Sequence, residues 1–334
     1  MVERGRLEEL LNRLPEVGIA VLGDFAVDGY WEADMVRSEL SRETPFHTKP
    51  VLSERYSLGA AGNVAANLRS IGCGTVRAVT LIGEDWRGST MLDLFRAQGI
   101  DAEYVQRAPE RNTTAFIKPM LKGFEAVTED ARFDFENKAR PSADLEKELL
   151  DSLSRAIAES NAVILCDQVN MGLFSDTLIK ACSELARENP TVFFFADSRY
   201  RIAEFRHMIL KPNEIEACGA AGIDFRDGQS IQEAGKALSA EDKPLFITAG
   251  SDGVYGFGDE EFHQPGFPRE EPLDIVGAGD TFLSALAGIM AAGGTPGEAA
   301  FCACLASSIT VKKLNITGTA SPEEMLTRFD EIKT

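Results

Sequence analysis

The sequence predicts an α/β protein whose mostly parallel sheet is covered by helices on both faces, with a smaller sheet beside it. Two observations support this fold class. Short apolar segments alternate with amphipathic segments through most of the chain, which indicates parallel strands joined by helical crossovers. Two polar stretches at about 30–57 and 102–135 interrupt this alternation. We expect these stretches to form short strands that pair outside the main sheet.

The first segments show how the elements are predicted. Four leucines lie at helical spacing within 1–14, which indicates an amphipathic helix, and the segment lacks the apolar core of a signal peptide. The apolar run 17–23 ends at Gly-Asp and is typical of a buried parallel strand. Further elements are expected over 61–71 (helix), 76–82 (strand) and 87–98 (helix), and short polar strands over 103–106, 113–119 and 131–135.

After Pro141 the alternation of strands and helices becomes regular. The expected strands are 162–166, 191–196, 207–210, 244–248 and 253–258. The expected helices are 143–158, 174–188, 213–220, 230–238, 278–292, 296–313 and 321–332. No internal repeat or linker divides the chain, so we expect one domain over 1–334 with the two polar stretches inserted in it.

Charge and cysteine content limit the partners. The chain has 34 Lys+Arg and 53 Asp+Glu, a net charge of −19 at pH 7, which argues against a nucleic-acid partner. None of the six cysteines forms a C-x-x-C pair, and we expect them to be reduced and buried in a cytoplasmic protein. No apolar run is long enough to span a membrane.

The sharpest chemical signal is the segment Asp274-Ile275-Val276-Gly277-Ala278-Gly279-Asp280, which precedes an apolar helix. Its glycines allow close approach of the backbone, and a helix N-terminus attracts anions, so Gly277, Ala278 and Gly279 are expected to form an anion hole. Asp280 would repel a phosphate unless it accepts a proton from an attacking hydroxyl. The alternative is a glycine-rich turn capped by Asp280, and spacing alone leaves both interpretations open.

A second small-residue turn, at 58–68, also enters a helix. Asn63 and Asn67 lie four residues apart and therefore on one helical face. Small residues and two amides suit the close approach of a polyhydroxy ligand. The alternative is a tight strand–helix connection with capping asparagines.

Together, and in this order, the two motifs resemble the ribokinase-like, or PfkB, family of carbohydrate kinases. The resemblance extends from Val17 to about Phe329. It implies a Rossmann-type, ribokinase-like core, with the two polar stretches forming a β-sheet lid. It also implies transfer of the γ-phosphoryl group of ATP to a sugar hydroxyl with Mg²⁺, and it is compatible with a monovalent cation such as K⁺.

The resemblance implies roles for individual residues. Asp280 corresponds to the catalytic base, with Gly277, Ala278 and Gly279 as the anion hole. The expected substrate-binding residues are Asp28, Gly59, Asn63, Arg132 and Asp274. The expected nucleotide-binding residues are Asn213, Thr248, Gly250, Gly253 and Cys304. Asn213 and Glu216 match an Asn-x-x-Glu element that acts on Mg²⁺ through water, although the same pair also fits a capping box.

Within the family, the chain looks closest to the branch that phosphorylates heptose 7-phosphate at its anomeric hydroxyl. The likeness lies at 28–31, 41–45 and 132–136. The candidate cations for the substrate phosphate are Arg42, Arg111, Lys118 and Arg132. The chain departs from the branch at four places. It has Gly59-Ala60 in place of Gly-Gly, and the loop that begins at Asp167-Gln168 lacks the lysine of the branch. It has Asp197-Ser198-Arg199 in place of Asp-Pro-Lys, and Cys304 in place of Asn. The first three departures are expected on or near the substrate side.

Three functions remain open at this point. The first is phosphorylation of a sugar or sugar phosphate, with heptose 7-phosphate as the named candidate. The second is a kinase for another sugar or a nucleoside on the same fold. The third is a catalytically silent protein that binds a sugar or a nucleotide. Exposed sheet edges and faces tend to be covered, so we also expect a homodimer formed through the lid.

Overall fold

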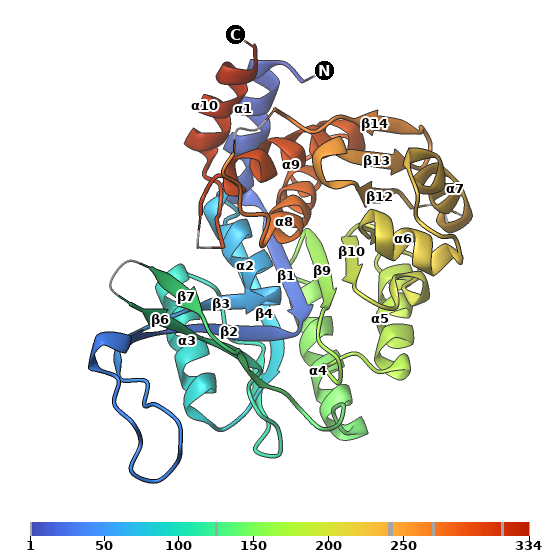
Figure 1. Cartoon of the computed structure of the whole chain (residues 1–334). Coiled ribbons are helices and arrows are strands. Elements are labelled where there is room, and N and C mark those ends of the chain that lie inside the picture. The colour runs from blue at the N-terminus through green and yellow to red at the C-terminus, as the bar shows by residue number, and fades with distance from the viewer. Residues whose placement is uncertain (1, 124–125, 240–242, 269–270, 315–316, 334) are drawn as a thin grey trace.

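The computed structural model describes residues 2–123, 126–239, 243–268, 271–314 and 317–333. Among them, the main sheet has nine strands in the order β14-β13-β12-β11-β10-β9-β1-β4-β5 (Figure 1). The strands are β1 (Gly18–Gly23), β4 (Thr75–Ile82), β5 (Val105–Arg107), β9 (Ala162–Asp167), β10 (Phe193–Ser198), β11 (Ile209–Leu210), β12 (Leu245–Thr248), β13 (Val254–Phe257) and β14 (Phe262–Gln264). Only the pairs β12–β13 and β13–β14 are antiparallel in this sheet, so the fold class predicted from the sequence is confirmed.

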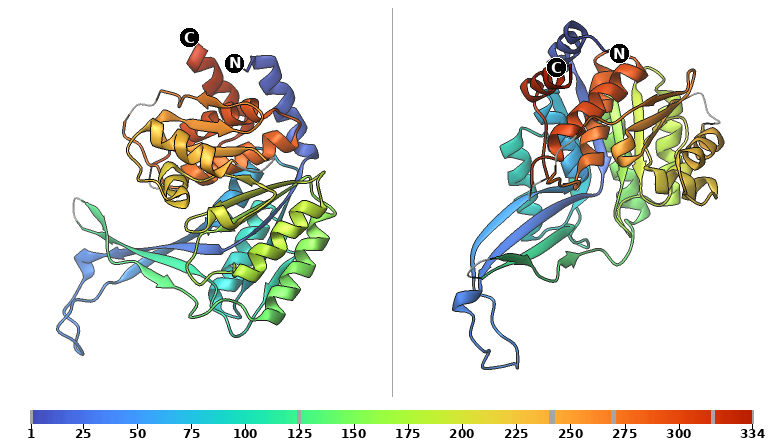
Figure 2. Two further views of the ribbon diagram at one scale, coloured as in Figure 1. Left: turned by 90° about the vertical axis from the view of Figure 1, so that its right-hand side faces the viewer. Right: turned by 45° about the horizontal axis from the view of Figure 1, so that its top comes forward.

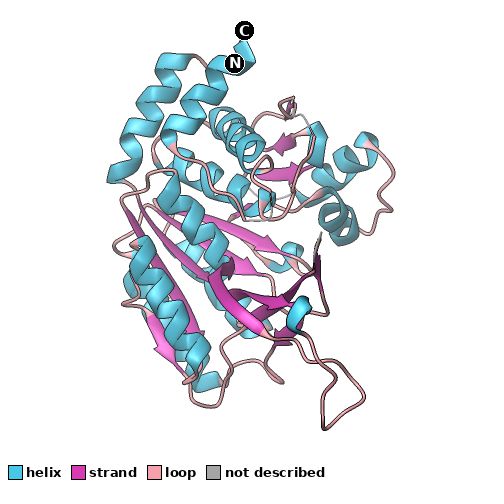
Figure 3. Ribbon diagram, turned by 60° about the vertical axis from the view of Figure 1, so that its left-hand side comes forward, coloured by secondary structure: helices cyan, strands magenta, loops and turns pink. Residues whose placement is uncertain are grey.

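The central strands are apolar on both faces because both faces are covered. In β1, Ile19 and Val21 belong to one hydrophobic core, whereas Ala20 and Leu22 belong to the other. Helices α1 (Arg4–Arg13), α2 (Ala61–Ser70), α8 (Ala278–Ala291), α9 (Pro296–Thr310) and α10 (Pro322–Lys333) contribute to the first core. Helices α4 (Ala143–Ile157), α5 (Asp176–Glu188), α6 (Glu214–Ala221) and α7 (Gly228–Leu238) contribute to the second. Figure 3 shows helices on both sides of the strands of the main sheet.

A second, smaller sheet projects from the core and forms the lid (Figure 2). Its strands are β2 (Phe25–Asp34), β3 (Val51–Ala60), β6 (Ala115–Lys122), β7 (Val127–Glu129) and β8 (Phe133–Phe135). Strand β2 lies between β3, which is antiparallel to it, and β6, which is parallel. Helix α3 (Trp86–Gln98) packs against β2 and β3 at the base of the lid.

Three short strands differ from the sequence prediction. Strand β5 was expected within the lid stretch 102–135, but it pairs with β4 of the main sheet. Strands β7 and β14 were not expected at all, and each pairs with a longer neighbour. In a strand of three residues, the alternation of apolar and polar side chains is too short to show which face is buried. The tertiary structure therefore decides which strand it pairs with.

The cysteines and the helix lengths can be described together. All six cysteines are buried and unpaired with one another. In the described part of the chain, none of the helices combines the length and the apolar character that crossing a membrane requires.

Candidate active site

The first motif shapes the N-terminus of α8, which faces the residues that follow β9, β10, β11 and β12. Gly277 has a φ of 79°, and a Cβ there would lie 2.5 Å from Cγ2 of Thr317. The N–H of Ala278 donates to the carbonyl of Ile275 at 3.2 Å. The N–H groups of Gly279 and Asp280 belong to the first turn, where no intrahelical acceptor exists. The helix therefore leaves the N–H groups of Gly279 and Asp280, rather than that of Ala278, for an acceptor outside it.

Asp280 is half-buried and held by two side-chain amides. Its Oδ2 accepts a hydrogen bond from Nδ2 of Asn63, and its Oδ1 accepts one from Nε2 of Gln168, both at 3.2 Å. Burial, followed by the charge of Asp197, raises the pKa of Asp280 to about 6, against the lowering effect of both amides and Lys211. A carboxylate with a pKa near neutrality is suited to accept a proton from a hydroxyl.

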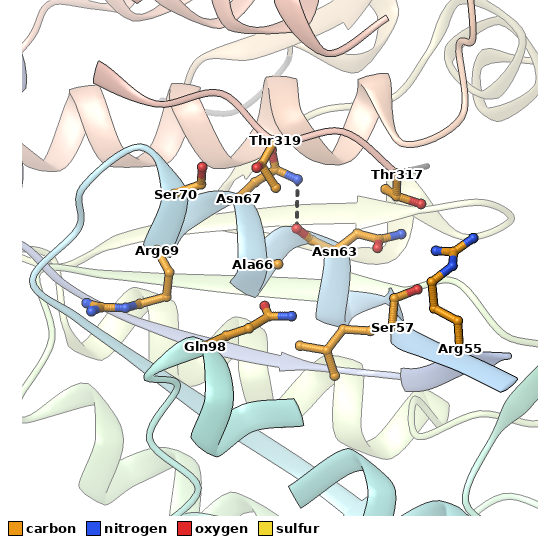
Figure 4. Close-up of a pocket in the computed structure, with 11 residues that line it drawn as sticks. Arg55, Ser57, Asn63, Ala66, Asn67, Arg69, Ser70, Gln98, Thr317 and Thr319 are labelled. Carbon is orange, nitrogen blue, oxygen red and sulfur yellow. Dashed lines mark hydrogen bonds between the residues drawn. The ribbon is translucent and has the colours of Figure 1, made fainter. Parts of the chain in front are cut away.

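The second motif places Asn63 and Asn67 on the face of α2 that meets α8. The N-cap of α2 is Ala60, so neither asparagine caps the helix. Asn67 is fully buried; it accepts from the Thr281 hydroxyl at 2.9 Å and donates to the Asn63 carbonyl at 2.8 Å (Figure 4). Asn67 thus joins the two helices, whereas the Asn63 side chain reaches Asp280.

A polar cavity of about 520 Å³ opens beside these amides (Figure 4). Its lining is Arg55, Ser57, Leu58, Asn63, Ala66, Asn67, Arg69, Ser70, Gln98, Thr317 and Thr319. No described lining residue carries a carboxylate, although acidic residues far outnumber basic ones in this chain. The Arg69 guanidinium donates to the carbonyls of Cys73 and Gly74, whereas the Arg55 guanidinium lies over the Tyr30 ring.

The lid residues Asp28, Gly59 and Arg132 lie close to one another. A Cβ at Gly59 would lie 2.7 Å from the Asp28 carboxylate, so glycine leaves room for that side chain. Arg132 donates twice to Asp134, at 2.5 and 2.6 Å, and its guanidinium lies 4.7 Å from the Phe116 ring centre. Burial raises the pKa of Asp28, while the charges of Lys118 and Arg132 act to lower it.

The expected nucleotide-binding residues surround a second cavity, of about 450 Å³, on the other side of Asp280. Asn213, Thr248, Gly250, Gly253 and Cys304 all line it, together with the segment 277–280. Gly253 has a φ of 94°, and a Cβ there would lie 2.1 Å from the Gln264 carbonyl oxygen, so this turn needs glycine.

Asn213 and Glu216 form the capping box of α6. Oδ1 of Asn213 accepts from the Glu216 N–H at 2.8 Å, and Oε2 of Glu216 accepts from the Asn213 N–H at 2.8 Å. Both residues also line the second cavity. The capping interpretation is therefore confirmed, and both residues of the capping box lie on the wall of that cavity.

Three residues beside Asp280 were not assigned a role from the sequence. Lys211, Asp197 and Gln168 line the second cavity. The buried Lys211 lies 3.4 Å from Oδ1 of Asp197, and its Nζ is 3.7 Å from the position of a Cβ on Gly279. Burial lowers the pKa of Lys211, but the charges of Asp197, Glu216 and Asp280 outweigh this and raise it overall. The signal in the sequence that could have identified Lys211 is its position as the one charged residue of the apolar segment 208–212.

Some expected site residues lie apart from the two cavities. Asp274 lines neither of them; its Oδ1 accepts from the Val276 N–H at 3.1 Å and shapes the loop before α8. Arg111 is buried, donates to the Ala139 carbonyl and lines a different cavity. Arg199, expected on the substrate side, lines the cavity of Asn213 and Thr248 instead.

Comparisons with known proteins identify the family of this chain. Residues 29–323 match the profile of the pfkB family carbohydrate kinases. The chain is 32% identical over 333 residues to the bifunctional protein HldE of Trichlorobacter lovleyi, and 31% identical over 332 residues to that of Geobacter sulfurreducens. Each alignment includes 97% of this chain but only 65% of the relative, so the chain spans about two thirds of those proteins.

Solved structures share the fold at lower identity. Arabidopsis thaliana ribokinase, complexed with ribose and ATP, aligns with 93% of this chain and 98% of its own, at a TM-score of 0.67 and 21% identity. Phosphofructokinase-2 from Escherichia coli, in complex with substrates and products, aligns with 95% of this chain and all of its own, at a TM-score of 0.73 and 16% identity. Given the family match over most of its length, the chain belongs to the pfkB family of carbohydrate kinases.

Proposed function

We propose that this protein transfers the γ-phosphoryl group of ATP to a hydroxyl of a phosphorylated sugar. The observation that carries the proposal is the position of Asp280. Its carboxylate lines the cavity of the expected nucleotide-binding residues, and Asn63, which donates to it, lines the polar cavity on the other side. Asp280 would therefore stand between a donor and an acceptor, as the base of a phosphoryl transfer requires.

The chemical step uses groups of this chain in defined ways. Asp280 takes the proton of the acceptor hydroxyl as its oxygen bonds to the γ-phosphorus. The bond from the γ-phosphorus to the β–γ bridging oxygen breaks, and ADP leaves. The N–H groups at the start of α8 and the Lys211 ammonium face the transferring group and stabilise its negative charge. The lid excludes water and thereby limits hydrolysis of ATP.

The Mg²⁺ ion implied by the family fits this cavity as a companion of ATP. Among the described residues, no group of three or more His, Cys, Asp or Glu side chains is arranged to hold a metal ion alone. Asn213 and Glu216 line the cavity and would contact the ion through water. When bound, Mg²⁺ neutralises charge on the ATP phosphates.

The inner face of the lid supports an anionic acceptor. Tyr30 pairs across the sheet with Arg55 on one side and Lys118 on the other. The Arg55 guanidinium lies 4.1 Å and the Lys118 ammonium 5.2 Å from the Tyr30 ring centre. Asp28, two residues before Tyr30, lies on the same face. This arrangement suits a sugar whose hydroxyls meet Asp28 and whose phosphate meets Arg55 and Lys118.

The candidate acceptor is heptose 7-phosphate, phosphorylated at its anomeric hydroxyl. This choice rests on the lid cations, on the resemblance of 28–31, 41–45 and 132–136 to the heptose kinase branch, and on the similarity to the HldE proteins. The departures at Ala60, Gln168 and Arg199 change residues around the site and leave Asp280 and the α8 N-terminus intact.

We also propose a homodimer formed through the outer face of the lid. The ring centres of Trp31 and Phe133 lie 6.3 Å apart on this face. Leu52 lies on the same face, because it is two residues from Glu54, which pairs with Trp31 across the sheet. Leu52 and Phe133 are 56% and 52% exposed. A second copy of this chain would cover the apolar surface that α3 leaves open.

The test measures ADP release with Mg·ATP and heptose 7-phosphate, and then with other sugar phosphates, free sugars and nucleosides. Asp280→Asn should lower kcat by about a thousandfold or more while ATP still binds, because the amide cannot accept the proton. Asp93→Asn, the same change on the exposed side of α3, is the control. Full turnover by Asp280→Asn would contradict the proposed base. Turnover on free sugars alone would refute the phosphorylated acceptor.

A further inference from the structure

After β9, the loop formed by residues 168–173 is fixed by a buried carboxylate. Asp24 follows β1 directly, and its side chain accepts hydrogen bonds from the N–H groups of Gln168 (3.3 Å), Val169 (3.2 Å) and Leu173 (2.7 Å). Asp24 is 5% exposed. Three backbone donors to one buried carboxylate define the path of a loop that would otherwise be free to vary.

The same loop is also held at both ends. Asp167, before the loop, accepts from the Ser198 hydroxyl at 2.7 Å and from the Arg201 guanidinium at 3.2 Å. Arg201 also donates to the carbonyl of Phe174, which follows the loop, at 2.6 Å. Within the loop, a Cβ on Gly172 would lie 2.3 Å from the Asp24 carboxylate. The backbone position of Gln168 is therefore set by its surroundings.

The side chain of Gln168 lies between two carboxylates. Its Nε2 is 3.2 Å from Oδ1 of Asp280 and 3.3 Å from Oδ2 of Asp197. A primary amide has two hydrogens, so one nitrogen can donate to both carboxylates at once. Asn63 holds the other oxygen of Asp280 from the opposite side. The carboxylate plane of Asp280 is thus fixed by one amide on each oxygen.

We propose that Gln168 is a positioning residue for phosphoryl transfer, which orients Asp280 and separates it from Asp197, and that Asp24 places Gln168 by holding the loop backbone. This inference rests on the proposed function, in which Asp280 is the base. Gln168 lines the cavity of the expected nucleotide-binding residues, but the role proposed for it is exerted through its hydrogen bond to Asp280.

The charged and titratable groups around Asp280 define what the loss of Gln168 would do. Asp197 approaches from β10, Lys211 from the end of β11 and the Cys166 thiol from β9, and Glu216 on α6 acts on Lys211. Without the amide, the ionised carboxylate of Asp280 loses a hydrogen bond that stabilises it. The repulsion between the carboxylates of Asp280 and Asp197 also becomes stronger, because no donor lies between them. We therefore expect Asp280 to retain its proton to a higher pH.

The first measurement needs no substrate. The carboxyl carbons of ¹³C-aspartate-labelled protein are titrated by NMR, and the Asp280 signal is identified by its loss in Asp280→Asn. Gln168→Met has a similar length and no donor, and it should raise the pKa of Asp280 by about one unit. Gln229→Met, the same change at an exposed glutamine that contacts Glu233, should leave the Asp280 signal unchanged.

The second measurement follows kcat against pH with heptose 7-phosphate. Gln168→Met should lower kcat about tenfold well below pH 6 and about twofold at pH 7, recover toward wild type by pH 9, and leave the KM for ATP within twofold. Asp24→Ala should shift the acid limb in the same direction although Gln168 is present. The double variant Asp24→Ala/Gln168→Met should add little to either single variant, because both act through one contact.

The outcomes separate this inference from the proposed function. An unchanged Asp280 titration in Gln168→Met, or a loss of kcat that is equal at every pH, would overturn the positioning role while Asp280 remains the base. Additive effects of Asp24→Ala and Gln168→Met would overturn the link through the loop. Full activity of Asp280→Asn would instead refute the proposed function, and the NMR result would still report the Gln168–Asp280 contact.

Discussion

The carboxyl edge of the main sheet and the lid place their charges in different surroundings. At the sheet edge, Lys211 and Asp197 are buried and paired, and Gln168 joins Asp197 to Asp280. On the lid, Arg55 is exposed, and its guanidinium packs on the face of the Tyr30 ring. Charges in a buried network interact strongly with one another, whereas exposed charges are screened by water.

This difference indicates how the two regions divide the work. A preorganised, water-poor cluster stabilises the charge of a transferring phosphoryl group without reorganising during the reaction. Exposed side chains on a sheet face can be exchanged with little effect on folding, so the lid is where acceptor preference can change. Changes at the sheet edge should therefore affect kcat and stability together, and changes on the lid should affect the acceptor KM or the assembly.

The largest effect is expected from Lys211→Met. It leaves Asp197 buried without its cation, which should lower the free energy of unfolding by about 3 kcal/mol. The loss of the ammonium beside Gly279 should lower kcat at least a hundredfold. Adding Asp197→Asn should restore most of the stability in a denaturant titration but not the activity. A double variant with normal turnover would show that Lys211 serves folding alone.

The next effect concerns the outer face of the lid. Leu52→Asp combined with Phe133→Asp should convert a dimer into a monomer of 36.3 kDa, as measured by light scattering after size exclusion, because a charge is costly to bury in an apolar interface. Phe225→Asp changes an exposed aromatic residue between α6 and α7 and is the control. A dimer that survives the lid changes would place the interface elsewhere.

A smaller effect is expected on the inner face of the lid. Arg55→Ser and Lys118→Ala should each raise the KM for a phosphorylated acceptor about tenfold, because each removes one charge-assisted contact. The kcat and the KM for ATP should not change. Lys122→Ala is the matched control, since Lys122 lies on β6 four residues farther from the site. Equal effects of Lys118→Ala and Lys122→Ala would contradict a localised phosphate site.

The smallest effect is a gain in stability at Ala60. This residue has a φ of 52° and a ψ of −127°, a conformation that favours glycine, and it stands where the family has its second glycine. Ala60→Gly should raise the free energy of unfolding by about 1 kcal/mol, less than the full strain because glycine is more flexible when unfolded. Ala66→Gly, within α2, should lower it by a similar amount in the same denaturant titration.

Local patterns in the sequence were sufficient for the fold class and for the two motifs. The apolar runs that become β1 and β9 indicate strands covered on both faces. Glycine is required at 277 and 253 by the positive φ angles and the close contacts at these positions. The glycines in the sequence therefore indicated both turns. Asn63 and Asp280 were recognised because each belongs to a contiguous motif, although 217 positions separate them.

The sequence marked Asp167-Gln168 and Asp197-Ser198-Arg199 as segments near the site, but it assigned no role to the three residues beside Asp280. Gln168, Asp197 and Lys211 lie at or just after the carboxyl ends of three different strands, and Gln168 is 112 positions from Asp280. They converge because parallel strands end at one edge of the sheet, which local spacing does not encode. Local spacing also did not show that the three residues of β5 pair with β4 of the main sheet rather than with the lid.

The sequence by itself determined the alternation of strands and helices, the buried cysteines and the glycine turn before α8, because each depends on neighbouring residues and on backbone conformation. Only the tertiary structure decided which side chains surround Asp280, which cations face the acceptor, and which lid surface stays uncovered. Those features depend on contacts between segments far apart in the chain, and their energies arise from burial and charge that exist only after folding.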